Sequence, residues 1–206
     1  MEYGFILLGY LLGSIPFGLV FARLGGYGDI RKIGSGNIGA TNVLRTGNKP
    51  LALLTLVCDI FKGAVAVWIS FYSADSLIIL ATGLLAVIGH MYPVWLKFKG
   101  GKGVATTLGT MLAIMPLLAL IMIGIWLVMA FALRISSLAA LTAFAAAPVI
   151  AYTIFTDANL ALFSGIIALL VFWRHQENIK RLLKGAEPKI GSKKKKEEHA
   201  SSQPSE

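Results

Sequence analysis

The chain has 206 residues, of which 56% are hydrophobic and only 14% are charged. A soluble globular domain carries about 25% charged residues, so this composition excludes an ordinary soluble enzyme and predicts a membrane protein. The formal net charge is +9, but four of the lysines form one run at residues 193–196, with no aromatic and basic surface beside them. We therefore expect membrane lipids or phosphorylated small molecules as partners, and no nucleic acid.

Apolar segments follow one another along the chain and are expected to form membrane helices. They cover residues 3–24, 51–72, 77–96, 104–133, 138–155 and 160–173. The fourth has no charge and is too long for one ordinary span. Pro116 near its middle is expected to divide it, because proline removes a helical hydrogen bond. The predicted fold class is an all-α polytopic membrane protein with seven transmembrane helices, some of them short.

The distribution of charge predicts the orientation of these helices. If the N-terminus is outside, every loop that contains Lys or Arg falls on the inner side, and the outer loops carry only Glu2, Asp75 and Asp157. We therefore expect the C-terminus in the cytoplasm. Residues 1–190 are predicted to form a single membrane domain. The polar, lysine-rich tail at 191–206 is expected to be disordered.

The first inner loop contains the motif GSGNIGATNVLRTG at residues 34–47. Its opening fits the dinucleotide fingerprint G-x-G-x-x-G, but that fingerprint has meaning only inside a soluble βαβ unit, which the apolar surroundings exclude. The glycines permit close backbone approach, and Arg45 is a candidate clamp for a phosphate. The candidate ligand-binding residues are Gly34, Ser35, Gly36, Asn37, Thr41, Asn42 and Arg45. The alternative is a tight glycine turn with solvated polar groups.

The second inner loop, FKGGKGVATTLG at residues 98–109, runs directly into a helix. The N-terminus of a helix presents free N–H groups and the positive end of its dipole, so this loop is expected to bind an anion. The candidate residues are Gly100, Gly101, Lys102, Gly103 and Thr106. The loop is not a Walker A motif, because a glycine follows Lys102. The hydroxyls of Thr106 and Thr107 alternatively bond their own backbone.

The third motif, RHQENIKRLLKG at residues 174–185, lies where the last apolar segment ends. His175 and Asn178 are three residues apart and share a helix face, where an imidazole and an amide can act on one ligand. The alternative is that His175 is a plain polar residue at the membrane interface. Glu177 is expected to make structural pairs with Arg174 and Arg181.

Three ionisable residues lie inside the apolar segments. Asp59 and Lys62 are three residues apart, and we expect them to pair with each other, because a lone charge in hydrocarbon is costly. The alternative is that they face the site. His90 is expected to have a hydrogen-bonded packing role, and the alternative is that it shapes the site together with Tyr92 and Pro93. The single cysteine, Cys58, excludes a disulfide framework, and we expect no metal site and no cofactor.

Taken together, the three motifs resemble those of the PlsY family, the bacterial acyl-phosphate:glycerol-3-phosphate acyltransferases. The resemblance runs in order from about residue 9 to residue 185. It implies a seven-helix enzyme of the bacterial inner membrane with its active site on the cytoplasmic side. Such an enzyme transfers a fatty acyl group from acyl phosphate to the sn-1 hydroxyl of glycerol 3-phosphate. The products are lysophosphatidic acid and inorganic phosphate, in the first acylation of phospholipid synthesis.

The resemblance also implies roles for residues of this chain. The essential set would be Ser35, Arg45, Lys102, His175 and Asn178. The second motif would be the glycerol 3-phosphate loop, and Glu177 would support structure. The proton acceptor would be His175 or the phosphate of the substrate, and Ser35 a ligand rather than a nucleophile. We expect a monomer.

The alternative class of protein is a small transporter of an organic phosphate. It would have matching interrupted helices in the two halves of the chain. The sequence indicates one interruption, at Pro116, without a counterpart. A non-catalytic lipid-binding scaffold would leave the dense glycine and asparagine motifs unexplained.

Overall fold

The computed structural model describes residues 2–191 and is built from helices joined by short loops. The helices of the first half are α1 (Tyr3–Gly13), α2 (Phe17–Leu24), α3 (Ala40–Val43), α4 (Lys49–Ser70) and α5 (Ser76–Met91). Those of the second half are α6 (Val104–Ile114), α7 (Pro116–Leu133), α8 (Ser136–Thr153), α9 (Ala158–Arg174) and α10 (Gln176–Leu183). Three short 3-10 turns are η1 (Ile30–Lys32), η2 (Leu44–Thr46) and η3 (Val94–Leu96). The predicted disordered tail lies, from residue 192 on, outside the described residues.

The number of membrane spans follows from helix length. By length and composition, five segments of the described chain can cross a membrane, and the bent pair α9 and α10 would make six. The break at Pro116 is confirmed, and it leaves α6 with 11 residues. A helix of that length rises only about 16 Å, roughly half of a hydrocarbon core. The described chain therefore has five or six candidate spans instead of the seven predicted, and α6 is too short to span alone.

The predicted first segment, residues 3–24, is long and apolar enough to cross a membrane, but it consists of two helices, α1 and α2. Ser14, Ile15 and Pro16 lie between them, and Pro16 has no N–H to continue the helix. The apolar length of residues 3–24 predicts a membrane span, but it does not predict the break at Pro16. The break leaves the carbonyl of Ile15 outside a regular helix.

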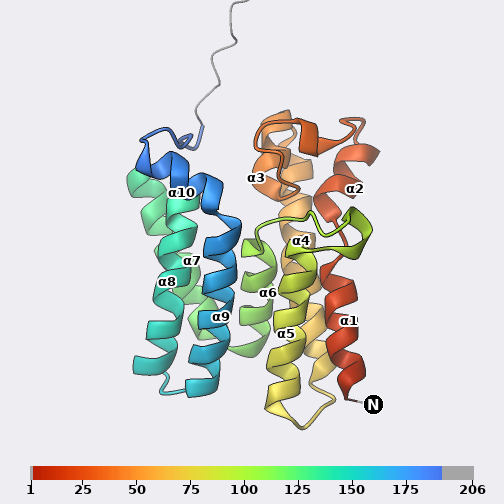
Figure 1. The fold of residues 1–206 in the computed structure, drawn as a ribbon, viewed down its shortest axis with the longest axis vertical. Helices are drawn as coiled ribbons and strands as arrows, with labels where there is room; N and C mark the ends of the chain where they lie inside the picture. The colour runs from red at the N-terminus through yellow and green to blue at the C-terminus, as the bar shows by residue number, and fades with distance from the viewer. Residues whose placement is uncertain (1, 192–206) are drawn as a thin grey trace, which may run out of the picture.

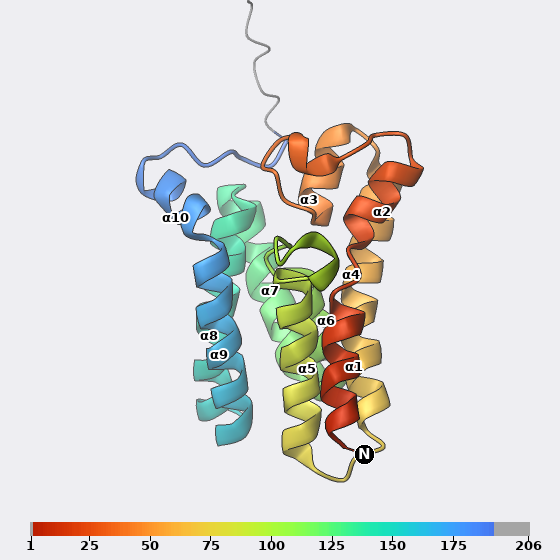
Figure 2. The same ribbon diagram turned by 45° about the vertical axis from the view of Figure 1, so that its right-hand side comes forward.

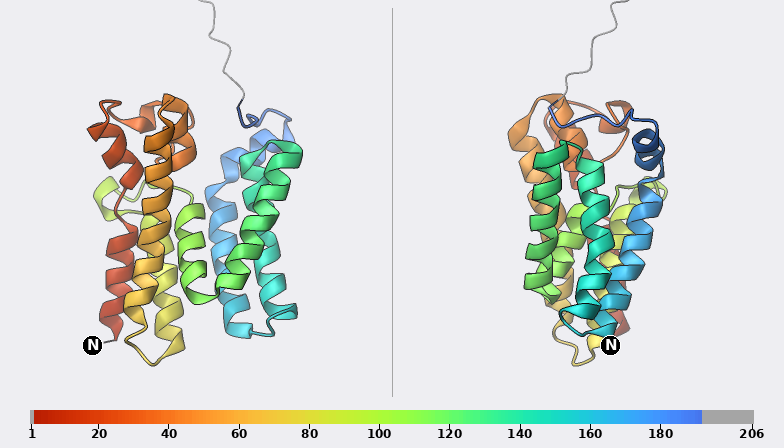
Figure 3. Two further views of the ribbon diagram at one scale, coloured as in Figure 1. Left: turned by 180° about the vertical axis from the view of Figure 1, so that it is seen from behind. Right: turned by 90° about the vertical axis from the view of Figure 1, so that its left-hand side faces the viewer.

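The helices form two groups that stand side by side (Figure 1; from behind in Figure 3). In the first group α1 packs against α5, and α4 packs against α6; in the second, α8 packs against α7 and α9. Glycines allow the close approaches: a Cβ at Gly13 would collide with the carbonyl of Ala86, and one at Gly109 with the carbonyl of Ile60. Such small residues let membrane helices come near enough for backbone contact.

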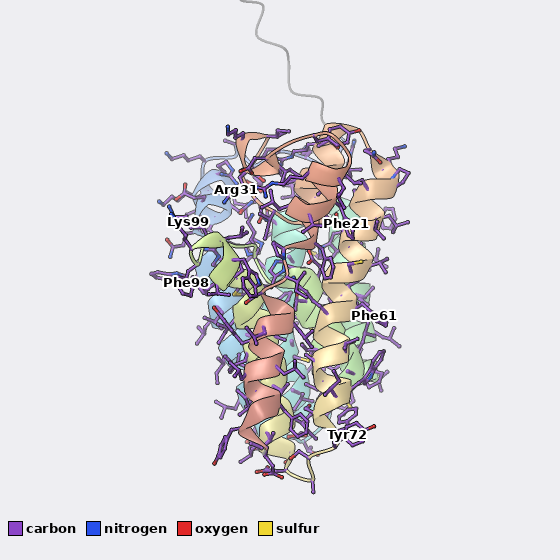
Figure 4. The ribbon with its side chains drawn as sticks, turned by 90° about the vertical axis from the view of Figure 1, so that its right-hand side faces the viewer. Phe21, Arg31, Phe61, Tyr72, Phe98 and Lys99 are labelled. Atoms are coloured by element: carbon purple, nitrogen blue, oxygen red, sulfur yellow. The ribbon has the colours of Figure 1, made fainter. Side chains whose placement is uncertain are left out.

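The two ends of the bundle differ in charge. Arg31 and Lys99 lie at the same end as Phe98, while Tyr72 lies at the opposite end and Phe61 projects from α4 between them (Figure 4). All the loops predicted to be inside gather at the first end, with α3 and α10 (Figure 1). The segment after α10 runs back across this end (Figure 2), where the backbone N–H of Ile190 donates to the carbonyl of Arg134 at 2.6 Å.

Candidate active site

The three motifs meet at the basic end of the bundle. Lys102 of the second motif donates a hydrogen bond to the side-chain oxygen of Asn178 in the third. Arg45 of the first motif lies close enough to Lys102 for its charge to act on that ammonium group. The site thus joins segments from both helix groups. The sequence alone predicts only that the three motifs lie on the same side of the membrane.

Asn42 organises the loop of the first motif. Its side chain is 1% exposed, and its Nδ2 donates to the carbonyls of Ile30 and Ile33, both at 3.0 Å, and of Asn37 at 2.8 Å. Its Oδ1 accepts from the backbone N–H of Ser35 at 3.0 Å and from the hydroxyl at 3.2 Å. The polar atoms of Asn42 are therefore used within the loop, which points to a structural role rather than direct ligand contact.

The other groups of this loop face outward. Ser35, Thr41 and Arg45 are exposed, and Asn37 is half-buried. Gly34 and Gly36 have φ angles of 59° and 71°, which favour glycine. A Cβ at Gly34 would lie 2.7 Å from Cδ of Arg45, so this glycine also makes room for the arginine. The loop presents the hydroxyls of Ser35 and Thr41 and the guanidinium of Arg45 to solvent, and a guanidinium is suited to binding a phosphate.

Replacing Asn42 by alanine is expected to loosen this loop. The change removes three hydrogen bonds to loop carbonyls and the acceptor of the Ser35 N–H and hydroxyl, and should cost about 3 kcal/mol of local stability. Trypsin should then cut faster after Arg31 and Lys32 in detergent-solubilised protein. Thr46→Ala is the matched control, since the hydroxyl of Thr46 donates only to the carbonyl of Val43. Equal cleavage rates in both variants would contradict the role of Asn42.

The glycines of the second motif press the loop against the end of α5. The backbone N–H groups of Gly100 and Gly101 donate to the carbonyls of Met91 at 3.1 Å and His90 at 3.0 Å. A Cβ at Gly101 would collide with Nε2 of His90. Gly103 has a φ of 83° and is the N-cap of α6. These glycines are therefore needed for packing, and anion binding by their backbone stays a prediction.

Thr106 and Thr107 follow in the first turn of α6. Both are fully buried, and neither hydroxyl has a hydrogen-bond partner among the described residues. Thr106 packs against Gly63 of α4, where a Cβ on the glycine would lie 3.2 Å from its methyl group. The alternative of bonding to their own backbone is not observed, and contact of Thr106 with a ligand stays a prediction.

The third motif supplies a buried imidazole and amide at the bend between α9 and α10. The two helices meet at 65°, and His175 lies at the bend. His175 is 3% exposed, with Nδ1 at 2.7 Å from the carbonyl of Val171. That contact assigns the proton to Nδ1 and leaves Nε2 as an acceptor. Asn178 is 6% exposed and lies one turn further on.

Glu187 is a functional residue that the sequence motifs missed. Its Oε1 accepts from Nδ2 of Asn178 at 2.5 Å and from the hydroxyl of Ser137 at 2.8 Å, while Oε2 accepts from Nε of Arg181 at 2.7 Å. Because Nδ2 of Asn178 faces this carboxylate, its Oδ1 is turned toward Lys102. The available signal was an acid placed two residues beyond the third motif, in an otherwise basic stretch.

The predicted pairing of Glu177 with Arg174 and Arg181 is wrong. Glu177 is exposed and pairs with Lys180 at 2.8 Å. Arg174 instead donates to the carbonyls of Gly101 at 3.0 Å and Gly100 at 2.8 Å. Helical spacing alone suggested the pairs, but the bend at His175 directs Arg174 toward the second motif.

Burial and neighbouring cations set the electrostatics. Burial lowers the pKa of Lys102 to about 8; the carboxylate of Glu187 opposes this shift, and Arg181, Arg45 and Arg174 add to it. Burial, together with the charge of Lys102, lowers the pKa of His175 to about 4. Burial also acts to raise the pKa of Glu187, but its hydrogen bonds outweigh burial and the pKa is lowered. Near neutral pH the site thus holds neutral His175 and several cations.

Such a site is suited to phosphorylated ligands. Lys102 of the second motif and Arg174 of the third act on a neutral imidazole whose Nε2 can accept a proton or a hydrogen bond. Within residues 2–191, no three His, Cys, Asp or Glu side chains gather closely enough to hold a metal ion.

Comparison with known proteins identifies relatives over nearly the whole chain. A family model for glycerol-3-phosphate acyltransferase matches residues 3–185. A glycerol-3-phosphate acyltransferase of Paramagnetospirillum magneticum is 57% identical over 189 residues, which are 92% of this chain and 94% of the relative. One of Mesorhizobium japonicum is 55% identical over 196 residues, 94% of this chain and 100% of the relative.

Solved structures show the same similarity. The crystal structure of PlsY, an integral membrane glycerol 3-phosphate acyltransferase, in its glycerol 3-phosphate form matches with a TM-score of 0.88 and 42% identity, covering 92% of this chain and 96% of that one. The lysophosphatidic acid form matches with a TM-score of 0.85 and 41% identity, covering 92% and 95%.

Proposed function

Because this chain belongs to the glycerol-3-phosphate acyltransferase family, we propose that it takes the acyl group from acyl phosphate and transfers it to the sn-1 hydroxyl of glycerol 3-phosphate. The products are lysophosphatidic acid and inorganic phosphate. The observation that carries this proposal is the hydrogen bond from Lys102 of the second motif to Asn178 of the third, at a site where the charge of Arg45 in the first motif helps to lower the pKa of Lys102. A reaction between two phosphorylated substrates needs two phosphate contacts, and Arg45 and Lys102 are the cations we assign to them.

The chemistry requires positioning more than covalent activation. Acyl phosphate is a mixed anhydride, so attack of the glycerol hydroxyl oxygen on the carbonyl carbon forms the ester, and the bond from that carbon to the phosphate oxygen breaks. Arg45 and Lys102 hold phosphates and stabilise the charge that develops on the leaving group. Ser35, exposed beside Arg45, serves as a phosphate ligand.

The proton of the attacking hydroxyl can go to His175 or to a substrate phosphate. Nε2 of His175 is unprotonated, but a pKa of about 4 makes it a weak base. A phosphate dianion, with a pKa of about 6, is the stronger acceptor. We therefore assign the proton to the phosphate, while His175 accepts a hydrogen bond from the hydroxyl and orients it.

The chain is an integral membrane protein, and we propose a bacterial inner-membrane location with the active site in the cytoplasm. The seven apolar segments, including α6, would span or enter the bilayer with the N-terminus outside. This follows from the basic residues gathered at the end that carries the site. Labelling of single cysteines placed at Asp75 and Lys180, in a Cys58→Ser background, tests it: an impermeant reagent should reach the first from outside and the second only after permeabilisation.

The activity itself is tested by phosphate release from purified protein in lipid or detergent. Acyl phosphate is supplied with and without glycerol 3-phosphate, beside the variants Arg45→Ala and His175→Ala. Release that depends on the acceptor, matches lysophosphatidic acid formed and is lost in both variants supports the proposal. If no turnover occurs, and vesicles containing the protein instead move glycerol phosphate across the bilayer, the protein is a transporter.

The lowered pKa of Lys102 predicts a pH dependence. Lys102 is cationic below about pH 8 and loses its charge as the pH rises through that value. Glycerol 3-phosphate stays a dianion there, so kcat/KM for this acceptor should fall above pH 8 by up to about tenfold per pH unit. Lys102→Arg keeps its charge and should move the fall to higher pH. A flat wild-type profile to pH 9.5 would contradict the assignment.

A further inference from the structure

Three ionisable side chains meet behind the second motif, inside the first helix group. Asp59 and Lys62 of α4 and His90 of α5 are 2%, 5% and 4% exposed. Nζ of Lys62 lies 2.8 Å from Oδ1 of Asp59, which confirms the predicted pair. Nδ1 of His90 lies 3.6 Å from the same oxygen. The mechanism above uses none of these three residues.

The outer members of this cluster both contact irregular backbone. Nζ of Lys62 donates to the carbonyl of Ile15 at 2.8 Å, in the break between α1 and α2. His90 bonds Gly101 through its carbonyl, and its ring lies directly against that glycine. The cluster therefore links the start of α2 to the residue that precedes Lys102.

The start of α2 in turn supports the first motif. A Cβ at Gly18, in the first turn of α2, would collide with the carbonyl of Ile38. The first motif thus rests on α2, just as the second rests on α5. Lys62 contacts the backbone just before α2, and Asp59 lies beside His90, whose carbonyl accepts from Gly101.

Apolar packing alone would not need these groups. Burying two charges in a bundle is costly, and replacing such a pair by apolar residues is often neutral or stabilising. Within the described residues, Asp59 and Lys62 form the ion pair with both side chains almost fully buried. The pair lies behind the loop that carries Lys102, so a role in holding that loop would explain why these costly buried charges are present.

We propose that Asp59, Lys62 and His90 are positioning residues that hold the Gly100–Lys102 segment in the geometry that binds the acceptor's phosphate. Arg174 holds the carbonyls of Gly100 and Gly101 from the other side. The segment is thus fixed between the cluster and the third motif. This inference rests on the proposed function, with glycerol 3-phosphate as the acceptor at the second motif.

Two variants test the cluster. Asp59→Asn combined with Lys62→Met removes both charges while keeping the volumes similar, and His90→Ala removes the ring behind Gly101 while leaving the ion pair intact. The matched controls are Ser70→Ala on α4 and Thr82→Val on α5. Both controls are buried, and their hydroxyls bond only carbonyls of their own helices, Val67 and Ile78.

The measurements are KM for each substrate, Tm, and Kd for glycerol 3-phosphate by calorimetry. We expect KM and Kd for glycerol 3-phosphate to rise about tenfold in both variants, with KM for acyl phosphate within about twofold and the controls unchanged. Unchanged acceptor values, or losses for both substrates that follow a fall in Tm, would overturn the proposal. If the double variant does not fold, His90→Ala decides. A wild type that binds glycerol 3-phosphate without turnover would overturn only the proposed function, because Kd still tests the cluster.

Discussion

Replacing Lys102 by methionine is expected to lower kcat/KM for glycerol 3-phosphate by about a thousandfold. Methionine keeps the length of the side chain but removes the charge that pairs with phosphate. It also removes the hydrogen bond that Lys102 donates to Oδ1 of Asn178. Since the effect falls on ground-state binding and on charge developing in the transition state, both KM and kcat should change. Steady-state rates over a range of acceptor concentrations measure it.

Lys99→Met is the matched control. Lys99 lies three residues earlier in the same loop, is exposed, and carries the same charge. Long-range attraction of an anion would be weakened equally in both variants, whereas direct binding would be lost in one. A comparable loss of activity in Lys99→Met would mean that the net charge of the loop, and not the contact made by Lys102, determines the rate.

Replacing Glu187 by glutamine should lower activity by about a hundredfold and destabilise the basic end by about 3 kcal/mol, because a charged acceptor of three hydrogen bonds is lost. Its side chain is 8% exposed and turns Asn178 toward Lys102. Without the carboxylate the surrounding cations repel one another, so the pKa of Lys102 should fall further. Thermal unfolding and the pH profile of kcat/KM measure the two effects.

Glu177→Gln provides the comparison. This residue is ten positions earlier, and its side chain is 71% exposed with a partner only in Lys180. Exposed pairs of this kind contribute little to stability, so activity and Tm should stay near the wild-type values. If Glu177→Gln were the damaging change and Glu187→Gln the silent one, the hydrogen-bond network described for Asn178 would be incorrect.

Much of the fold was predictable because membrane helices depend on apolar length. Segment boundaries and the break at Pro116 follow directly from the sequence. The division between α1 and α2 was missed because residues 3–24 are long enough for one span, and apolar length by itself does not show where a helix breaks. The break at Pro116 also predicts a short helix before it, but with 11 residues α6 is too short to cross the hydrocarbon core.

The site was predictable to a lesser extent. The density of polar residues identified the three motifs, but it predicted ligand contact for Asn42 and Ser35 alike. In the structure Asn42 is buried and bonds its own loop, whereas Ser35 is exposed. Local spacing paired Arg174 with Glu177, whereas its real partners lie more than seventy residues away in the sequence. Contacts between distant segments depend on how the helices pack, and sequence spacing cannot supply them.

The segment that carries Glu187 also affects the order in which the protein matures. It follows every apolar helix and returns past Arg134 across the basic end. During synthesis all the membrane helices are therefore made before the carboxylate that orients Asn178. A chain shortened just before Ala186 would still contain every hydrophobic segment, yet its candidate active site would lack the carboxylate of Glu187 that orients Asn178.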